Sequence, residues 1–339
     1  MPGDTREHHP NPTGELVRRS PAVLTSLAVA AALTLAGCSG GSTPEPSASA
    51  SESASATATP AGTEMPTVEG AFGEDPKITF PGTGAPADLK VEVLHAGDGA
   101  EVGADDFVVA HYKGQVWDVD KAFDSSFDRG APTGFSLNAV IKGWKQGLTG
   151  THVGDRVLLS IPPDLGYGEQ GAGQDIPGGS SLVFVVDVVD AYGKGAAGQA
   201  DAKPVEPAPD LPVEVTGDLG APAEVKVKEG AAEPTKPTAT VIATGTGEAV
   251  PETPGTTLIL QLAENVWDNS QANSTWQTSG PTSVQVGQGG IFDQLVGVPV
   301  GSRAVLQLPA NENSGNGTPS PAIAGVVDIV GMVPAPATK

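Results

Sequence analysis

The chain has 339 residues, and its 40 acidic against 18 basic side chains give a formal net charge of −22. Because binding to a nucleic-acid backbone requires clustered lysine and arginine, this balance argues against nucleic acid as a partner. The length predicts two domains, and 45 glycines and 31 prolines with only 4% aromatic residues indicate a loop-rich, secreted β protein.

The first 37 residues have the pattern of a secretory signal peptide. Arg18 and Arg19 precede an apolar run from Pro21 to Ala36, which is too short for a mature membrane helix and has the length of a signal-peptide core. The run ends in Leu35-Ala36-Gly37-Cys38, which resembles the lipobox of bacterial lipoproteins. This resemblance implies cleavage before Cys38 and attachment of lipid to its thiol. The alternative is an incidental thiol.

Cys38 is the only cysteine, so no intramolecular disulfide can form. Residues 38–66 are rich in Ser, Ala, Thr and Pro and hold too few large apolar side chains to offset the entropy lost on ordering, so we expect a disordered tether. Several acyl chains together anchor a protein firmly. We therefore expect a lipoprotein anchored to the outer face of the cell membrane, with an Ala-, Gly- and Pro-rich composition typical of actinobacteria.

Residues 67–192 are predicted to form a first domain of the α+β class. Short segments with alternating or β-branched residues predict strands, at Val68–Pro81, Leu89–Leu94, Phe107–Tyr112, Val157–Ile161 and Leu182–Val189. The one helical pattern lies around Lys142–Leu148. Several strands and one short helix predict a curved antiparallel sheet wrapped around the helix.

Aromatic residues and one carboxylate recur beside these elements, without a nucleophile and base that could form a hydrolytic pair. They occur in the blocks His111-Tyr112-Lys113-Gly114, Phe123-Asp124-Ser125-Ser126, Val140-Ile141-Lys142-Gly143-Trp144 and Leu165-Gly166-Tyr167-Gly168, followed by Ile176-Pro177 and Leu182-Val183-Phe184. This composition predicts an apolar concave pocket. The spacing of the histidines does not suit a metal, and we expect neither a metal nor another cofactor.

These blocks, in this order, resemble the FKBP-type peptidyl-prolyl cis-trans isomerases over roughly Leu89 to Asp190. The resemblance implies a pocket between helix and sheet. It assigns catalytic roles to Tyr112, Phe123, Asp124 and Tyr167. It assigns substrate binding to Arg129, Val140, Ile141, Trp144, Ile176 and Phe184.

Two of these assignments have simpler alternatives. Val140 and Phe184 are equally well explained as plain core residues, and Asp124 before two serines as a turn or capping residue. The sequence also departs from the family at three positions. Thr133 stands where a second pocket phenylalanine is frequent, Asp175 where an apolar residue is frequent, and Ala139 where an acid is frequent. These changes affect the expected rim of the pocket more than its floor.

The resemblance implies isomerisation of X-Pro bonds in exported proteins, by tighter binding of the twisted amide in an aromatic pocket. Its expected partners are proline-containing exported polypeptides, macrolide immunosuppressants and, through Cys38, the membrane. The alternative is a non-catalytic or weakly catalytic chaperone or peptide-binding lipoprotein of the cell envelope.

The rest of the chain repeats the first domain at a period of about 145–150 residues. Residues 193–209 are expected to be a linker and 210–335 a degenerate FKBP-like domain. Val116-Trp117-Asp118 recurs as Val266-Trp267-Asp268, so the scaffold persists.

The pocket residues of the first domain do not recur in this repeat. Leu262 replaces Tyr112, Ile291 replaces Trp144 and Gly325 replaces Phe184, and Phe123-Asp124 falls in the polar stretch Asn269 to Ser274. The Tyr167 loop shrinks to Glu312–Pro319. We expect this domain to lack isomerase activity.

Overall fold

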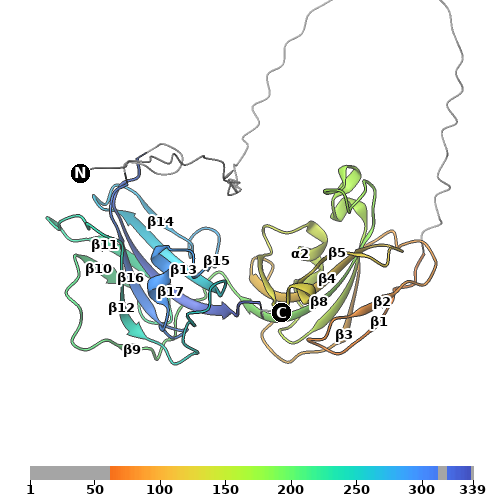
Figure 1. Cartoon of the computed structure of the whole chain (residues 1–339), viewed down its shortest axis with the longest axis horizontal. Coiled ribbons are helices and arrows are strands. Elements are labelled where there is room, and N and C mark those ends of the chain that lie inside the picture. The colour runs from red at the N-terminus through yellow and green to blue at the C-terminus, as the bar shows by residue number, and fades with distance from the viewer. Residues whose placement is uncertain (1–61, 312–318, 337–339) are drawn as a thin grey trace, which may run out of the picture. The chain divides into compact units, whose positions relative to one another are not determined.

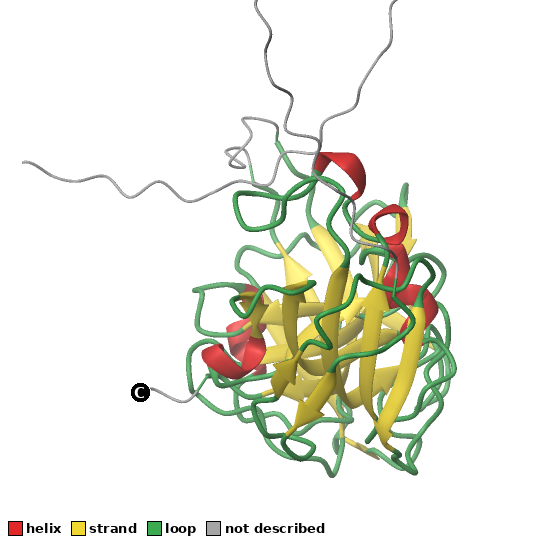
Figure 2. Cartoon of the chain, turned by 90° about the vertical axis from the view of Figure 1, so that its right-hand side faces the viewer, coloured by secondary structure: helices red, strands yellow, loops and turns green. Residues whose placement is uncertain are grey.

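The computed structural model describes residues 62–311 and 319–336, which form mainly antiparallel strands with a few short helices (Figures 1 and 2). The predicted signal peptide, Cys38, the tether as far as residue 61, and most of the Glu312–Pro319 loop lie outside the described residues. Within the described ranges, no helix is long and apolar enough to cross a membrane. The α+β prediction is confirmed.

The first sheet is built from six strands in the order β3-β7-β8-β4-β5, with β6 also paired to β4. Their bounds are β3 Lys90–His95, β4 Phe107–Val116, β5 Ala122–Ser125, β6 Thr133–Ser136, β7 Arg156–Ile161 and β8 Leu182–Tyr192. The two long central strands, β4 and β8, are rich in Val and Phe, which favour a pleated, buried surface. Their register places Tyr112 opposite Val186.

Helix α2, Lys142–Leu148, lies where the sequence predicted a helix and packs against β7 of this sheet. It buries Trp144 and Leu148, which join the main apolar core of the domain. Gly143 makes this packing possible, because a Cβ at this position would overlap the side chain of Ile161 on β7. Burying a large apolar side chain such as Leu148 stabilises the folded state by about 1.5–3 kcal/mol. An isolated helix of this length is unstable in water, so α2 depends on its packing against the sheet.

The remaining helical elements of the first domain are single turns. They are α1 (Ser126–Arg129), η1 (Pro163–Leu165) and η2 (Gly168–Gln170). Ser125 caps α1 by accepting a hydrogen bond from the Asp128 N–H.

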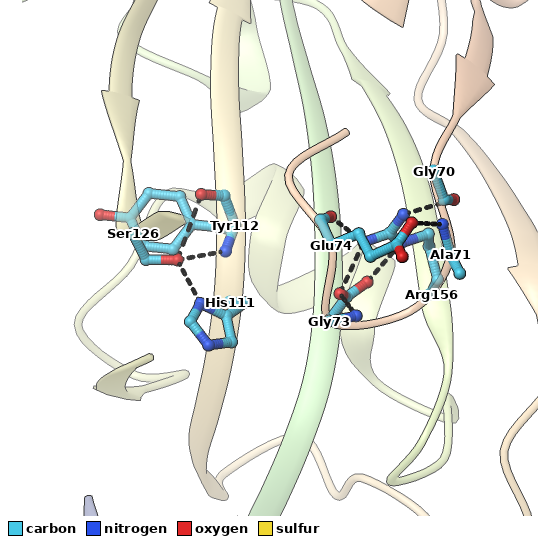
Figure 3. A network of polar contacts seen from close by, with 9 residues as sticks. Gly70, Ala71, Gly73, Glu74, His111, Tyr112, Ser126 and Arg156 are labelled. Carbon is cyan, nitrogen blue, oxygen red and sulfur yellow. Dashed lines mark hydrogen bonds and ion pairs between the residues drawn. The ribbon is translucent and has the colours of Figure 1, made fainter. Parts of the chain in front are cut away.

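An N-terminal hairpin, β1 (Thr67–Glu69) and β2 (Lys77–Thr79), is fixed by a buried ion pair on β7 and β8. Arg156 Nε donates to Asp187 Oδ1 at 2.6 Å, and its terminal nitrogens donate to the carbonyl oxygens of Gly70 and Glu74, each at 2.7 Å (Figure 3). The Asp187 carboxylate also accepts a hydrogen bond from the Gly73 N–H at 2.6 Å. Every charge in this group is therefore compensated.

Ordered contacts begin before the predicted domain boundary at residue 67. The Gly62 N–H donates to the Gly84 carbonyl at 2.9 Å, and Met65 packs against the small apolar cluster under the hairpin. The last five residues assigned to the tether, 62–66, are therefore part of the folded chain. Met65 supplies the apolar contact that the rest of that stretch lacks.

The second sheet repeats this arrangement, with the order β14-β13-β17-β16-β12-β9 and with β15 paired to β13. Its elements are β9 Lys203–Pro204, β12 Thr238–Thr244, β13 Thr257–Val266, β14 Ala272–Ser274, β15 Thr282–Gln285, η3 Ile291–Leu295, β16 Arg303–Leu308 and β17 Ile323–Val333. A hairpin, β10 (Val213–Thr216) and β11 (Glu224–Val227), precedes them.

The β10–β11 hairpin, like β1–β2, is held by a buried arginine–aspartate ion pair. Arg303 Nε donates to Asp328 at 2.7 Å, and a terminal nitrogen donates to the Ala221 carbonyl at 2.6 Å.

The segment predicted to be a linker contains strand β9. Lys203 and Pro204 pair with the edge strand β12, and the Val205 N–H donates to the Ile242 carbonyl at 3.0 Å. This segment therefore extends the second sheet by one short strand.

Candidate active site

An aromatic cavity of about 440 Å³ opens between α2 and the first sheet. The Trp144 indole is 4% exposed and is surrounded by the rings of Tyr112, Phe135 and Phe184, at centroid distances of 5.4, 5.2 and 5.2 Å. All three pairs are edge-to-face, the arrangement that aromatic quadrupoles favour. The cavity floor is therefore rigid and apolar.

A glycine on β4 makes room for two of these rings. Gly114 lies opposite Phe184 on β8, and a Cβ at Gly114 would lie 2.6 Å from Phe184 and 2.7 Å from Phe123. The rings of Phe123 and Phe184 meet edge-to-face at 5.5 Å in the space that the missing side chain leaves. Together they form one wall of the cavity.

The polar part of the site is a three-residue group at the cavity mouth. The Tyr112 hydroxyl donates a short hydrogen bond to one oxygen of Asp124, and Arg129 forms an ion pair with the other. Arg129 also donates to the Tyr112 hydroxyl at 2.7 Å. Both oxygens of Asp124 are thus engaged, which fixes the direction of its carboxylate.

The hydroxyl of Tyr112 stays protonated at neutral pH. Burial, with the hydrogen bond to Asp124 adding to it, raises the pKa of Tyr112 to about 12. Tyr112 is therefore a hydrogen-bond donor to Asp124 throughout the physiological range.

The backbone of Tyr112 is held from the opposite face of the strand. Ser126 Oγ accepts from the Tyr112 N–H at 2.7 Å, and His111 Nδ1 lies 3.1 Å from the same oxygen (Figure 3). The His111 ring stacks on Phe127 at 4.8 Å, and burial lowers the pKa of His111 below its ordinary value. His111 therefore faces away from the cavity, as the strand alternation predicted.

Most residues that the sequence assigned to the site line this cavity. They are Tyr112, Phe123, Asp124, Val140, Ile141, Trp144, Tyr167 and Phe184. Ile176 does not; it is 7% exposed and packs in the apolar core. Arg129 does not line the cavity; it contacts Asp124 and Tyr112, which do.

Phe135 lines the cavity but was not among the site residues predicted from the sequence. It lies on β6 two residues after Thr133, and its ring contacts both Tyr112 and Trp144, at 5.4 and 5.2 Å. Residues two apart on a strand share a face, so the alternation of β6 could have identified Phe135 once Thr133 was placed at the pocket.

The rim carries the departures from the family pattern. Asp175 forms an exposed ion pair with Lys121 at 2.8 Å, and Ala139 lines the cavity mouth. Tyr167 lies on the same rim and is 40% exposed. At the entrance, an acid, Asp175, therefore stands where an apolar residue is frequent, and Ala139 stands where an acid is frequent, while the floor keeps its aromatic rings.

The strand register of the second sheet locates the positions that correspond to the site. Leu262 lies opposite Val327 as Tyr112 lies opposite Val186, which confirms the predicted replacement of Tyr112. No ring therefore occupies the position of Tyr112 in the second sheet.

The same register applies to the aromatic wall and the carboxylate. In the first sheet, Gly114 lies opposite Phe184 on one side and Asp124 on the other. In the second sheet, Glu264 has the position of Gly114, and it lies opposite Gly325 and Asn273. The second sheet thus has an amide at the place of Asp124 and no ring at the place of Phe184.

Comparison with known proteins identifies the family of the first sheet. The family model for FKBP-type peptidyl-prolyl cis-trans isomerase matches residues 99–189. The chain is 41% identical over 118 residues to a probable FK506-binding protein of Corynebacterium glutamicum, covering 35% of this chain and 99% of that one.

Two further relatives match over a similar length of this chain. The chain is 44% identical over 119 residues to an FK506-binding protein of Streptomyces anulatus, covering 34% of this chain and 96% of that one. It is 43% identical over 122 residues to a probable FKBP-type peptidyl-prolyl cis-trans isomerase of Haemophilus influenzae, covering 36% of this chain and 48% of that one.

Proposed function

Because this chain belongs to the FKBP-type peptidyl-prolyl cis-trans isomerases, we propose that the cavity around Trp144 is where it isomerises X-Pro bonds. The observation that carries this proposal is one arrangement, in which edge-to-face rings form a closed apolar floor and an oriented carboxylate, Asp124, lies at its mouth. A proline ring fits the floor, and the amide before it reaches the mouth.

The reaction requires no proton transfer. Rotation about a peptide bond meets a barrier of about 18–20 kcal/mol, because it removes the resonance of the amide. The twisted amide is less charge-separated than either planar form, so an apolar site that excludes water favours it. Tighter binding of the twisted form than of the planar forms lowers the barrier.

The carboxylate of Asp124 acts on the substrate electrostatically. Tyr112 and Arg129 hold both of its oxygens, so it offers a fixed negative charge to the rotating amide without reorganising. Arg129 and Tyr112 are positioning residues for this charge.

Two further groups are suited to hold the peptide on either side of the proline. Within the described part of the chain, the Ile141 N–H at the start of α2 has no hydrogen-bond partner. The Tyr167 side chain is 40% exposed at the rim, so its hydroxyl can reach a substrate carbonyl. A carbonyl on each side of the proline would then be fixed while the bond between them turns.

The test compares full-length variants on the cis-to-trans conversion of a short Leu-Pro peptide. Asp124→Leu and Trp144→Leu are each expected to lower kcat/KM by about tenfold or more, because they remove the fixed charge and the floor. Asp164→Asn, at an exposed acid in η1, is the matched control and is expected to retain full activity. Wild-type rates in both Asp124→Leu and Trp144→Leu would place the reaction elsewhere.

The same cavity is proposed to bind macrolides of the FK506 type, since two relatives carry that ligand in their names. Thr133 and the Lys121–Asp175 ion pair leave the rim more polar than the floor, so affinity should be limited at the entrance. Inhibition of the peptide assay by FK506 tests this. Thr133→Phe is expected to tighten inhibition, and an unchanged inhibition constant would contradict a role for the rim.

We propose further that the chain is a lipoprotein, lipidated at Cys38 and exposed outside the cytoplasmic membrane, where it acts on exported proteins. The signal-like residues 1–37 support this, and X-Pro steps of about 10–100 s are slow enough for an export-side catalyst to matter. Triton X-114 partitioning of the protein from cells, with mass spectrometry of its N-terminal peptide, tests the anchor. Cys38→Ser is expected to move the protein into the aqueous phase.

For the second sheet we propose an FKBP-like domain that has lost isomerase activity and serves as a spacer or binding lobe. Its support is the shared strand order together with Leu262, Asn273 and Gly325 at the positions of the pocket residues. Transferring these three residues to the first sheet, as Tyr112→Leu/Asp124→Asn/Phe184→Gly in the full chain, is expected to abolish activity. Activity that survives this change would indicate catalysis by the second domain.

A further inference from the structure

The first sheet ends in an open edge with exposed aliphatic side chains. All six residues of β3 are exposed, and Val91, Val93 and Leu94 are 44%, 47% and 37% accessible. β3 pairs with β7 on one side, and no other described strand pairs with it. An unpaired edge of this kind presents backbone donors and acceptors to any extended chain.

In the second sheet, the corresponding edge is paired with an additional short strand. The edge strand, β12, is covered by β9, where Lys203 and Pro204 pair with Thr244 and Ala243. Ala243 pairs with Arg303 as His95 pairs with Arg156, so the second sheet accepts an added extended segment at the end of the edge that corresponds to His95. In the first sheet, no described strand fills the corresponding place.

The open edge and the substrate cavity belong to the same sheet and both adjoin α2. Val91 Cγ2 would be 3.5 Å from a Cβ at Gly147, in the last turn of α2, the helix that also carries Trp144. β3 is three places from β4 in the strand order, which at about 4.8 Å per place is roughly 14 Å. An extended chain advances about 3.3 Å per residue, so about five residues span this distance.

We propose that the edge of β3 binds an extended aliphatic segment of the same polypeptide whose X-Pro bond occupies the cavity. The inference rests on peptide binding in that cavity. Aliphatic segments are favoured because Val91 and Val93 supply apolar contacts, while Lys90 and Glu92 on the same strand carry opposite charges and select for neither sign. Backbone pairing supplies affinity and the valines supply preference.

Binding at two places on one chain raises affinity through effective concentration. Two substrates distinguish the contributions of the two sites. A short Leu-Pro tetrapeptide reaches the cavity only. A longer peptide joins the same sequence to a Thr-Val-Thr-Val segment through a flexible spacer of about six residues, so it can reach the edge as well. In the full-length protein, kcat/KM is expected to be about tenfold higher for the long peptide, through a lower KM. Val91→Lys/Val93→Lys is expected to abolish this advantage and leave the tetrapeptide rate unchanged.

The matched control is Val119→Lys, at an equally exposed valine in the turn after β4, which is expected to keep the full advantage. Unchanged tetrapeptide turnover shows that each variant is folded and that its cavity is active. Loss of activity in the cavity would lower turnover of both peptides, whereas loss of binding at the edge would affect the long peptide only. Hydrogen exchange provides a second readout. The β3 amides are expected to gain protection with the long peptide only.

Three outcomes would overturn the proposal. The first is a long peptide that is no better than the tetrapeptide, or an advantage that survives Val91→Lys/Val93→Lys. The second is a wild-type dimer that this variant converts to a monomer in light scattering, which would assign the edge to a second copy. The third is an advantage that appears only after residues 1–61 are removed, which would assign the edge to the chain's own N-terminal region.

Discussion

Gly114 lies directly opposite Phe184 on the central strands of the first sheet, and the absent side chain is what lets Phe184 and Phe123 meet as a wall of the cavity. In the second sheet the corresponding pair is Glu264 opposite Gly325. The glycine is on β4 in the first sheet and on β17 in the second. The second sheet therefore has no side chain at the position of Phe184. This facing pair is one of the differences between the two sheets, together with Leu262 at the position of Tyr112 and Asn273 at the position of Asp124.

Gly114→Ala is expected to impair the site. The added methyl would meet both rings within 2.7 Å, so the rings must shift, at a cost of about 1–3 kcal/mol in the free energy of unfolding. A displaced wall should also lower kcat/KM for the Leu-Pro peptide. Gly195→Ala is the control, since its Cβ would meet no atom within 4 Å. Equal activity of both variants would show that the wall tolerates displacement.

Tyr112 predicts a specific loss of stability at high pH. Its pKa is raised from the ordinary value of about 10 to about 12, so its contribution to stability is complete below pH 10 and is lost as the pH rises through 12. Urea unfolding at pH 9 and pH 11.5 should show a loss that is larger for the wild type than for Tyr112→Phe, by about 1–2 kcal/mol. The same loss in both proteins would mean that Tyr112 does not contribute. Between pH 7 and 9 the ionisation of Tyr112 should leave kcat/KM unaffected.

Phe135 and Ile176 should differ in their effects on catalysis. Phe135 lines the cavity and packs on Trp144, so Phe135→Ala is expected to lower kcat/KM by about tenfold, mainly by weakening the floor. Ile176 packs in the core, so Ile176→Val should cost about 0.5–1.5 kcal/mol of stability and leave kcat/KM near the wild-type value. Steady-state kinetics with thermal unfolding of both variants checks the pair, and a larger kinetic loss for Ile176→Val would reverse the assignment.

The buried pair formed by Arg156 and Asp187 should be far more important for stability than the exposed pair formed by Lys121 and Asp175. Asp187→Ala leaves a buried guanidinium without its counter-charge, which costs about 3–5 kcal/mol. Asp175→Ala removes an ion pair whose side chains are 77% and 56% exposed, which costs less than about 1 kcal/mol. Chemical denaturation measures both. Hydrogen exchange should show faster exchange in β1 and β2 in Asp187→Ala only.

Much of the first sheet and its site could be predicted from the sequence. Gly143-Trp144 in a short helical pattern and Tyr112 beside an outward-facing His111 are local features, because helix and strand periodicity fix which side chains share a face. The helix predicted around Lys142–Leu148 is present as α2.

What the sequence could not supply depends on distant partners. The Arg156–Asp187 pair joins residues 31 apart and reaches carbonyls 82 and 86 residues away, which no local pattern encodes. Ile176 was assigned to the pocket because of its place in a motif; it packs in the same apolar cluster as Trp144 and does not line the cavity itself. Phe135 was not predicted, although it lies two residues after Thr133 on the same face of β6.

The two hairpins differ in sequence but are held by the same kind of anchor. Arg156 and Arg303 donate to backbone carbonyl oxygens of their hairpins, of Gly70 and Glu74 in one case and of Gly217, Asp218 and Ala221 in the other. A carbonyl is the same in every residue, so the arginine recognises the path of the loop and not its side chains. The loop sequence is therefore free to drift, or to be replaced by design, as long as its backbone returns to the same arginine.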